Sequence, residues 1–275
     1  MHRTITPQQI RRFRTTVYTH FDREGRTLPW RTGYDPYHIL VSEIMLQQTQ
    51  VDRVIDKFTP FLRAFPTLHA LAQAPLDDVI ARWQGLGYNR RAAALRNAAR
   101  MIEKDFGGIV PQEPEQLHTL PGIGSATAAS IAAFAFNKPV VFLETNIRTV
   151  LIHHFFSDKA SVPDNDLIEI AAAALDRKNP RKWYSALMDY GTMLKKTVGN
   201  LSRKSITYKK QSPFAGSRRQ IRGAVLKCLV TMRQGTPAAI AGAIDRNAAD
   251  ITPVLDALVK EGLLHKEKRH YRIAR

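Results

Sequence analysis

Glu144 is the residue whose setting most suggests chemistry. It follows an apolar run from Pro139 to Leu143 and precedes a Thr-Asn-Ile-Arg turn. The run is typical of buried backbone, so the carboxylate must lie either at the rim of a core or inside a cleft. Only in a cleft could it steady a positive charge on a bound molecule, and the residue alone leaves both placements open.

A second candidate is the Leu-Pro-Gly-Ile-Gly turn at 120–124, which lies between two helical stretches. Gly122 and Gly124 allow a sharp turn that brings several backbone N–H groups to the start of the next helix, where the helix dipole favours a phosphate oxygen. A helix-hairpin-helix that binds a DNA backbone has this form. Taken alone, such a turn is more often an ordinary connection between helices.

The charge of the chain indicates a polyanionic partner. The sequence holds 41 Lys and Arg against 24 Asp and Glu, a formal net charge of +17, and its pI is near 10.2. Nucleic acid is the first candidate, and the alternative is a generally basic surface without such a partner. From 195 to 222 no acidic residue occurs among nine basic ones: Lys195, Lys196, Arg203, Lys204, Lys209, Lys210, Arg218, Arg219 and Arg222. We interpret this segment as a linker that follows phosphates.

Length and composition predict a globular protein. The 275 residues, 44% of them hydrophobic, have room for one large domain or two modest ones. The single cysteine, Cys228, excludes an internal disulfide framework and a cysteine-based metal site. No apolar run approaches the roughly 20 residues that span a bilayer, and the first residues lack a secretory signal. We therefore expect a cytoplasmic protein.

Helical periodicity dominates the first two hundred residues, so the expected fold class is all-α. Within 41–65, apolar residues recur at three-and-four spacing at Ile44, Val51, Val54, Ile55, Phe58 and Leu62. Further helices are predicted over 76–84, 90–106, 126–136, 164–176 and 180–194, joined by tight connections rich in glycine and proline. No strand is predicted before residue 265.

The C-terminal residues 213–275 read as a small winged-helix domain. Helices are predicted from about Arg218 to Met232, near Pro237 to Ala243 and from Ala248 to Glu261, followed by a two-stranded wing. The third helix of such a module commonly enters a DNA groove. This helix also carries Asp250, Asp256 and Glu261, so a role in protein contacts stays open.

Five motifs in this order resemble the helix-hairpin-helix (HhH-GPD) DNA glycosylase superfamily, and among its members the MutY-type A/G-specific adenine DNA glycosylases. They are LPWR at 28–31, SEIMLQQTQV at 42–51, GLGYNRRA at 85–92, LPGIG at 120–124 and ETNIRTV at 144–150. The resemblance covers roughly residues 5–212.

The resemblance implies a two-lobed helical module over 1–212, with a six-helix lobe at about 31–136 and a second lobe made of 1–30 and 137–212. It implies that double-stranded DNA and an extruded base are held between the lobes, because the glycosidic bond is out of reach in a stacked duplex. We expect a monomer, associated with the nucleoid and not with a membrane.

Site residues follow from the same motifs. Glu43 matches the acid that protonates a purine ring nitrogen before the base departs, and the alternative is an acid at a helix N-terminus after Ser42. Glu144 matches the carboxylate that stabilises the sugar cation, and Asn146 would orient it or the attacking water. The remaining matches are DNA contacts at Gln47, Gln48, Thr49, Leu86, Tyr88, Leu120, Gly122, Ile123, Gly124 and Ser125, and a base pocket at Trp30, Arg31 and Ala126. Leu86 and Tyr88 match the wedge that enters the base stack.

The chain also departs from the family. Glu144 stands where relatives have aspartate, which displaces the carboxylate by about 1.5 Å, on a scale to which catalysis is sensitive. Ala126 stands where bifunctional relatives have a Schiff-base lysine, so we expect a monofunctional enzyme without lyase activity.

The iron-sulfur cluster is a further difference. The positions of its four cysteines hold Lys195, Ser202, Ser205 and Gln211, so we expect no cluster. The only cofactor left is a monovalent cation that the hairpin can accept. The Nudix-like C-terminal domain of relatives that read 8-oxoguanine is replaced by the winged helix.

The leading expectation is a DNA glycosylase that removes adenine opposite guanine or 8-oxoguanine. Excision of thymine or uracil paired with guanine is the alternative within the class. From another class, the chain could be a non-catalytic protein that binds mismatched or damaged DNA.

Overall fold

The computed structural model describes residues 5–210 and 213–274. Its contacts divide the chain into two compact units. Unit 1 comprises residues 1–39, 112–118 and 124–210, and unit 2 comprises residues 40–111, 119–123 and 211–275. The helix α2 (Pro36–Leu46) crosses from one to the other. These units do not test the predicted domain boundaries, which stay a prediction.

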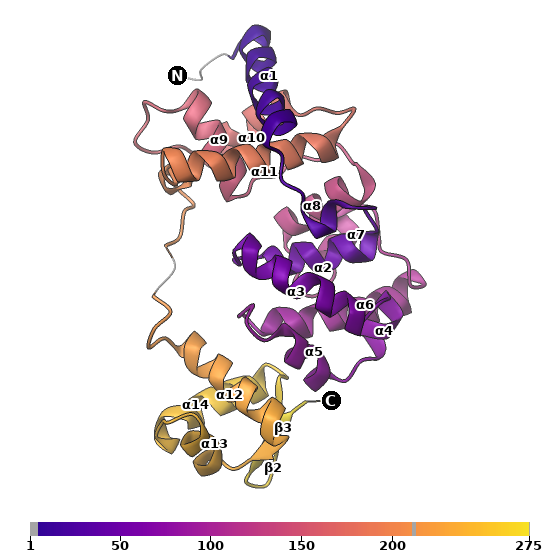
Figure 1. Ribbon diagram of the computed structural model, residues 1–275, viewed down its shortest axis with the longest axis vertical. Helices are drawn as coiled ribbons and strands as arrows, with labels where there is room; N and C mark the ends of the chain where they lie inside the picture. Colours follow the sequence, from indigo (N-terminus) through magenta and orange to yellow (C-terminus); the bar gives the residue numbers. More distant parts are fainter. Residues whose placement is uncertain (1–4, 211–212, 275) are drawn as a thin grey trace. The chain divides into compact units, whose positions relative to one another are not determined.

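Unit 1 is built on α11 (Pro180–Thr197), which packs against α1 (Pro7–Glu24), α8 (Ser125–Phe136) and α9 (Thr145–Phe155). Figure 1 shows α9 and α10 (Asp164–Ala174) close to α11. Short elements complete the unit: η1 (Pro29–Arg31), α7 (Pro114–His118) and η2 (Leu201–Lys204). Trp183 and Tyr184 of α11 are fully buried, and the ring of Phe13 meets Trp183 edge-on at 5.7 Å. The ring of Phe13 also meets Phe155 at the end of α9 at 5.1 Å, so this aromatic core joins α1, α9 and α11.

Unit 2 contains a helical part and a winged-helix part. In the helical part, α6 (Arg90–Phe106) packs on α4 (Leu68–Gln73) and α5 (Leu76–Trp83), and α3 (Val51–Ala64) packs on α5. Trp83, Leu95 and Ile80 form the centre of this core. The helix α6 ends where Gly107 adopts the left-handed conformation at φ +60°, which glycine accepts without strain.

The winged-helix part consists of α12 (Arg218–Met232), α13 (Pro237–Ala243), α14 (Ala248–Lys260) and a small sheet. The strands β1 (Gln234–Gly235), β2 (Leu264–Glu267) and β3 (His270–Ile273) pair antiparallel in the order β1-β3-β2. Figure 1 shows the three helices and the β2–β3 hairpin together. The helix α12 packs on α5, which joins this part to the helical part of the same unit.

The expectation of a mostly helical fold with a C-terminal winged helix is confirmed, but several details differ. The run 41–65 is two helices, because the backbone turns at 47–50 and Gln48 is left-handed at φ +54°. The two-stranded wing has a third strand, β1, ahead of α13, and β2 begins at 264. In the run before Glu144, Phe142 and Leu143 are buried and Pro139 is exposed.

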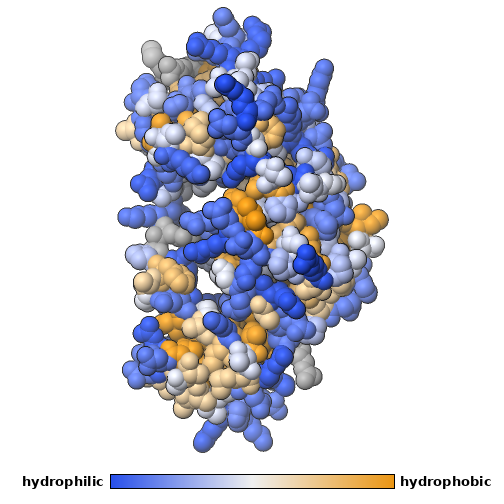
Figure 2. Space-filling model, viewed as in Figure 1, coloured by the Kyte–Doolittle hydropathy of each residue, from blue (hydrophilic) through white to orange (hydrophobic). Residues whose placement is uncertain are grey.

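Hydrophilic residues cover most of the face shown in Figure 2, as expected for a chain with a net charge of +17. Among the described residues, no helix is both long enough and apolar enough to cross a bilayer.

Candidate functional site

Glu144 occupies the N-cap position of α9 and folds its side chain back over the helix start. Its Oε1 accepts hydrogen bonds from the backbone N–H groups of Asn146 at 2.6 Å and Ile147 at 2.9 Å. Its Oε2 accepts one from the hydroxyl of Thr145 at 3.2 Å. The residue is half-buried, with buried Leu143 before it and exposed Thr145 after it, so the carboxylate lies at the rim of the core of unit 1. A helix N-terminus is a favourable place for negative charge.

Asn146 lies beside Glu144, as the motif predicts. Its Nδ2 is 3.4 Å from Glu144 Oε2 and 3.7 Å from the sulfur of Met188 on α11. The two helices approach closely here because position 191 is glycine: a Cβ on Gly191 would lie 2.7 Å from the Cβ and from the carbonyl oxygen of Asn146. The geometry around the acid therefore depends on the contact between α9 and α11.

The predicted base-pocket residues of η1 are strongly held within unit 1. Trp30 is buried, and the guanidinium of Arg31 pairs with both oxygens of Asp189 at 2.8 Å. Arg26 donates to the same carboxylate through its backbone N–H and its side chain. Burial raises the pKa of Asp189, but these donors outweigh it and the pKa is lowered. Arg31 thus anchors η1 to α11, a structural role that the sequence did not reveal.

The hairpin ahead of α8 uses its side chains as anchors. Leu120 and Ile123 are buried, so their side chains cannot meet DNA and only their backbone groups could. Gly122 has φ +78°, and a Cβ there would lie 2.7 Å from the Cβ of Ala94, so the turn requires glycine. Gly124 caps α8, and Ser125 and Ala126 are exposed in its first turn.

A buried arginine joins two turns of unit 2, at 47–49 and 86–87, which carry predicted DNA contacts and are called the recognition turns below. The guanidinium of Arg91 donates to the carbonyl oxygens of Ile44, Met45, Gln47, Leu86 and Gly87 and to the hydroxyl of Thr49. Arg91 is 8% exposed, and burial lowers its pKa to about 10. It belongs to the GLGYNRRA motif, but its role was not predicted. Five carbonyls converging on one guanidinium fix the turns at 47–49 and 86–87 to each other.

The predicted DNA contacts on these turns differ in exposure. Gln47 donates from Nε2 to the carbonyl of Gly122 at 3.0 Å, which links this turn to the hairpin. Gln48 is exposed, and Thr49 and Tyr88 are half-buried. Leu86 is only 3% exposed, so its side chain packs inside the unit and does not project as a wedge. Tyr88 is the better placed of the two predicted wedge residues.

Glu43 lies in the second half of α2, which begins at Pro36, and it is half-buried. The alternative interpretation of Glu43 as an acid at a helix N-terminus is therefore wrong. Its neighbours Ser42 and Ile44 are fully buried, so the carboxyl group sits at the edge of an apolar helix.

A cavity of about 1130 Å³ opens between the recognition turns and α12, all within unit 2. Arg219 of α12 donates to the hydroxyl of Tyr88 at 2.5 Å and lies 5.5 Å from the centre of its ring. The lining is basic, with Arg53, Arg90, Arg219, Arg222 and Lys227 against Glu261. Arg222 is neutralised, because it pairs with Glu261 at 2.6 Å. The segment 195–222 is accordingly no uniform linker: its two ends are helical.

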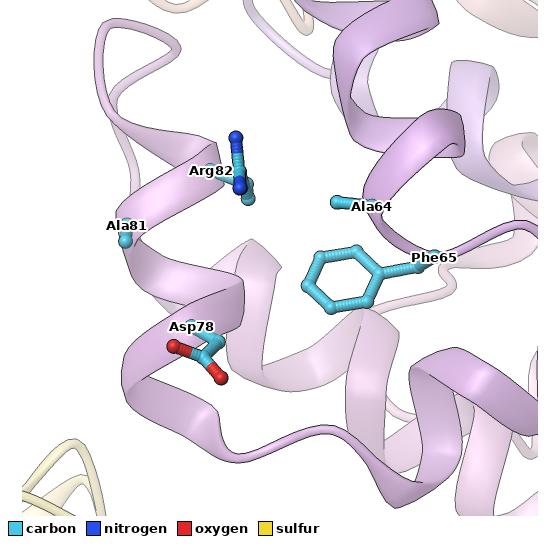
Figure 3. A pocket seen from close by; sticks show the side chains of 5 residues that line it. All are labelled: Ala64, Phe65, Asp78, Ala81 and Arg82. Carbon is cyan, nitrogen blue, oxygen red and sulfur yellow. The ribbon is translucent and has the colours of Figure 1, made fainter.

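A smaller hollow of about 430 Å³ lies between α3 and α5, also in unit 2. Figure 3 shows Asp78, Ala81 and Arg82 on one helix and Ala64 and Phe65 on the neighbouring segment. No predicted site residue lines it, and its two charged side chains have opposite sign. We assign it no function.

The positions that hold cluster cysteines in relatives do not fit an iron-sulfur cluster. Ser205 donates from its hydroxyl to Asp164 at 2.7 Å, and Ser202 to Asn200 at 2.6 Å. Arg148 and Thr207 also bind Asp164, and Arg148 is foremost in lowering its pKa to about 2. Gln211 lies outside the described residues. Among the residues that the structure describes, no group of His, Cys, Asp or Glu could hold a metal ion.

A mostly helical chain in which a glycine turn opens α8 and a capped carboxylate opens α9 defines a protein of the helix-hairpin-helix class. The chain belongs to the HhH-GPD superfamily of base excision DNA repair proteins, whose family model matches residues 41–265.

Three similar proteins illustrate the relationship. An adenine DNA glycosylase of Mycobacterium tuberculosis is 40% identical over 182 residues, which are 64% of this chain and 60% of that protein. An adenine DNA glycosylase of Mycolicibacterium smegmatis is 31% identical over 281 residues and covers 90% of both chains. The solved structure of a thermostable thymine-DNA glycosylase has 25% identity and a TM-score of 0.60, covering 68% of this chain and 87% of that one.

Proposed function

We propose that the protein is a monofunctional DNA glycosylase that removes adenine mispaired with guanine or 8-oxoguanine from double-stranded DNA. The observation that carries this proposal is the placement of Glu144. Its carboxylate is fixed at the start of α9, at the rim of the core, with Asn146 beside it. The adenine DNA glycosylases among the similar proteins support the choice of base.

In the proposed reaction the bond between C1′ of the sugar and the purine nitrogen breaks, and water supplies the hydroxyl that replaces the base. The proton that this water releases replaces the one that the departing base takes from Glu43. Glu144 stabilises the positive charge that develops on the sugar, and Asn146 orients the carboxylate or the water. Glu43 delivers a proton to a purine ring nitrogen, because an unprotonated adenine anion leaves poorly. The products are free adenine and an abasic site.

Water is the proposed nucleophile because Ala126 occupies the place of the lysine of bifunctional relatives. Without that amine there is no covalent imine to drive strand cleavage. Trapping with borohydride during turnover tests this step. A protein–DNA adduct would contradict the monofunctional assignment, and abasic sites without an adduct would support it.

We propose that the enzyme works without an iron-sulfur cluster. Hydrogen bonds of Asp164 to Arg148, Ser205 and Thr207 hold the loop after α11 in its place. Purified protein should contain no iron and should show no absorption band of an iron-sulfur cluster in the visible range. Stoichiometric iron would contradict this proposal.

A panel of duplexes with A·G, A·8-oxoG, T·G, U·G and hypoxanthine pairs tests the function. After incubation, alkali converts abasic sites into strand breaks, so a glycosylase leaves a break at the mismatch and a non-catalytic binder leaves none. We expect breaks at A·G and A·8-oxoG.

Excision of thymine or uracil opposite guanine is the second candidate, and it is favoured by the likeness to a thymine-DNA glycosylase. Replacing Glu43 by Gln separates the two. A pyrimidine needs this acid less, so retained thymine excision with lost adenine excision would show which chemistry uses Glu43. Wild-type cleavage of T·G but not A·G duplexes would contradict the adenine proposal.

A further inference from the structure

The hydroxyl of Thr145 links the proposed catalytic carboxylate to a lysine on another helix. Thr145 Oγ1 is 3.2 Å from Glu144 Oε2 and 2.9 Å from Nζ of Lys195. A lysine ammonium has donors only, so the hydroxyl must accept from it. The single proton of the hydroxyl then points to the carboxylate. The direction of this chain is therefore fixed, from Lys195 through Thr145 to Glu144.

The packing of α11 against α9 places the lysine there. Gly191 allows the close approach, because a Cβ at this position would overlap Asn146. Lys195 lies one helical turn beyond Gly191, on the same face of α11. Its neighbour Leu194 is buried and Lys195 itself is half-buried. In this position its Nζ donates to the hydroxyl of Thr145.

The electrostatics are consistent with a charged Lys195 ammonium that interacts with Glu144. Burial lowers the pKa of Lys195, and the negative charge of Glu144 acts against that shift. A charged donor polarises the hydroxyl and strengthens the hydrogen bond that the hydroxyl makes onward.

We infer that Lys195 is a positioning residue, which acts through Thr145 to hold Glu144 Oε2 in the orientation that the reaction needs. This inference rests on the proposed function of Glu144. It gives a role to a half-buried lysine of α11 that the sequence alone did not reveal. Backbone N–H groups hold Oε1, and Oε2 is held by Thr145 together with the side-chain amide of Asn146.

Single-turnover excision at saturating enzyme tests the inference with three variants of the full chain. Lys195→Met removes the donor and keeps an apolar stem, Thr145→Val removes the hydroxyl and keeps the shape, and Lys195→Arg keeps the charge. We expect the first two to lose about tenfold in rate, the size expected for one hydrogen bond that involves a charged group. The double variant Lys195→Met/Thr145→Val should be no slower than either single one, because both changes break the same chain. Lys195→Arg should recover most of the rate.

Binding and a matched control separate positioning from other roles. The affinity of Lys195→Met for a duplex with a stable abasic-site analogue should change less than twofold. The control is Lys159→Met, at an exposed lysine elsewhere in unit 1, and its excision rate should also change less than twofold. If Lys195 instead contacted a DNA phosphate, Lys195→Met would weaken binding and reduce the salt dependence of binding by about one charge, while the rate at saturating enzyme would stay unchanged. That result would overturn the inference, as would additive losses in the double variant.

Glu144→Gln distinguishes failure of this inference from failure of the proposed function. Loss of excision in Glu144→Gln together with full activity in Lys195→Met overturns only the role of Lys195. Full activity in Glu144→Gln overturns the role of the acid itself.

Discussion

The proposed catalytic acid and the recognition turns are positioned in opposite ways. Glu144 sits in ordinary extended backbone at φ −132°, and its own side chain binds the residues that follow it. Gln48 and Tyr88 sit in left-handed backbone at φ +54° and +48°, a conformation that costs an L-residue roughly 1–2 kcal/mol. What holds their turns is Arg91, a residue outside both of them.

This difference shows how the two regions can fail. The orientation of the acid is a local property of α9 and its contact with α11, so a change there affects chemistry more than folding. The recognition turns share the buried guanidinium of Arg91, and Thr49 also donates to the carbonyl of Leu86 and Trp83 to that of Gly87. A change of Arg91 therefore affects folding and recognition together.

Glu144→Gln should break the chemistry and leave the fold. We expect the excision rate at saturating enzyme to fall about a thousandfold, because the amide carries no charge to stabilise the sugar cation. Unfolding free energy should fall by only about 0.5 kcal/mol, because the amide oxygen can still cap α9. Single-turnover kinetics and denaturant unfolding measure the two effects. Glu169→Gln, an exposed acid of α10, is the control, and a variant of Glu144 with more than a tenth of the wild-type rate would contradict the prediction.

Arg91→Lys should break the other region. A lysine is a point donor that cannot serve both turns, so buried carbonyls lose their partners at a cost of about 3 kcal/mol in unfolding free energy. We also expect discrimination between mismatched and matched duplexes to fall. The matched control is Arg96→Lys on the same helix, since Arg96 is 4% exposed and donates to the carbonyl of Ala74 at 2.6 Å without touching the turns. Equal loss of discrimination in both variants would show that Arg91 has no special role.

Asp164→Asn tests the ion pair between Arg148 of α9 and Asp164 of α10. The hydrogen bond from Arg148, opposed by burial, lowers the pKa of Asp164 from 3.8 to about 2. A carboxyl group whose pKa is lowered by folding stabilises the protein at pH values above its ordinary pKa of 3.8. This stabilisation is lost as the pH falls from about 4 towards 2. We expect the variant to be about 1 kcal/mol less stable at neutral pH, given partial screening by solvent, and the difference to vanish near pH 2. A difference that does not depend on pH would contradict this assignment.

Gln48→Gly should sharpen the contrast with the smallest effect. Glycine accepts the left-handed conformation, so we expect the variant to gain about 0.5 kcal/mol of stability while its preference for mismatched DNA falls. Asp245→Gly, at φ +53° in an exposed turn away from the recognition residues, is the matched control and should leave that preference unchanged. A loss of stability in Gln48→Gly would show that the side chain contributes more than the strain costs.

Much of the fold could be predicted because helical periodicity is a local signal. The predicted helices at 90–106, 218–232 and 237–243 agree with α6, α12 and α13. The same signal failed at 47–50, because the apolar spacing continues across this turn. The structure shows the turn through the end of α2 at Leu46, the start of α3 at Val51 and the left-handed backbone of Gln48. It also gave no helix at 145–155, although Ile147, Val150 and Leu151 are buried at helical spacing. The cap formed by Glu144 was therefore not foreseen.

By itself the sequence determined the helical class, the basic charge, the glycine turn and the placement of Glu144 after an apolar run. These are properties of composition and of neighbouring residues. Contacts between distant elements were needed to show that Leu86 is buried, that Arg31 pairs with Asp189, and that Arg91 and Lys195 support the candidate residues. The partners of these side chains lie far away in the chain or on other elements, and contacts between elements leave no periodic mark in a single sequence.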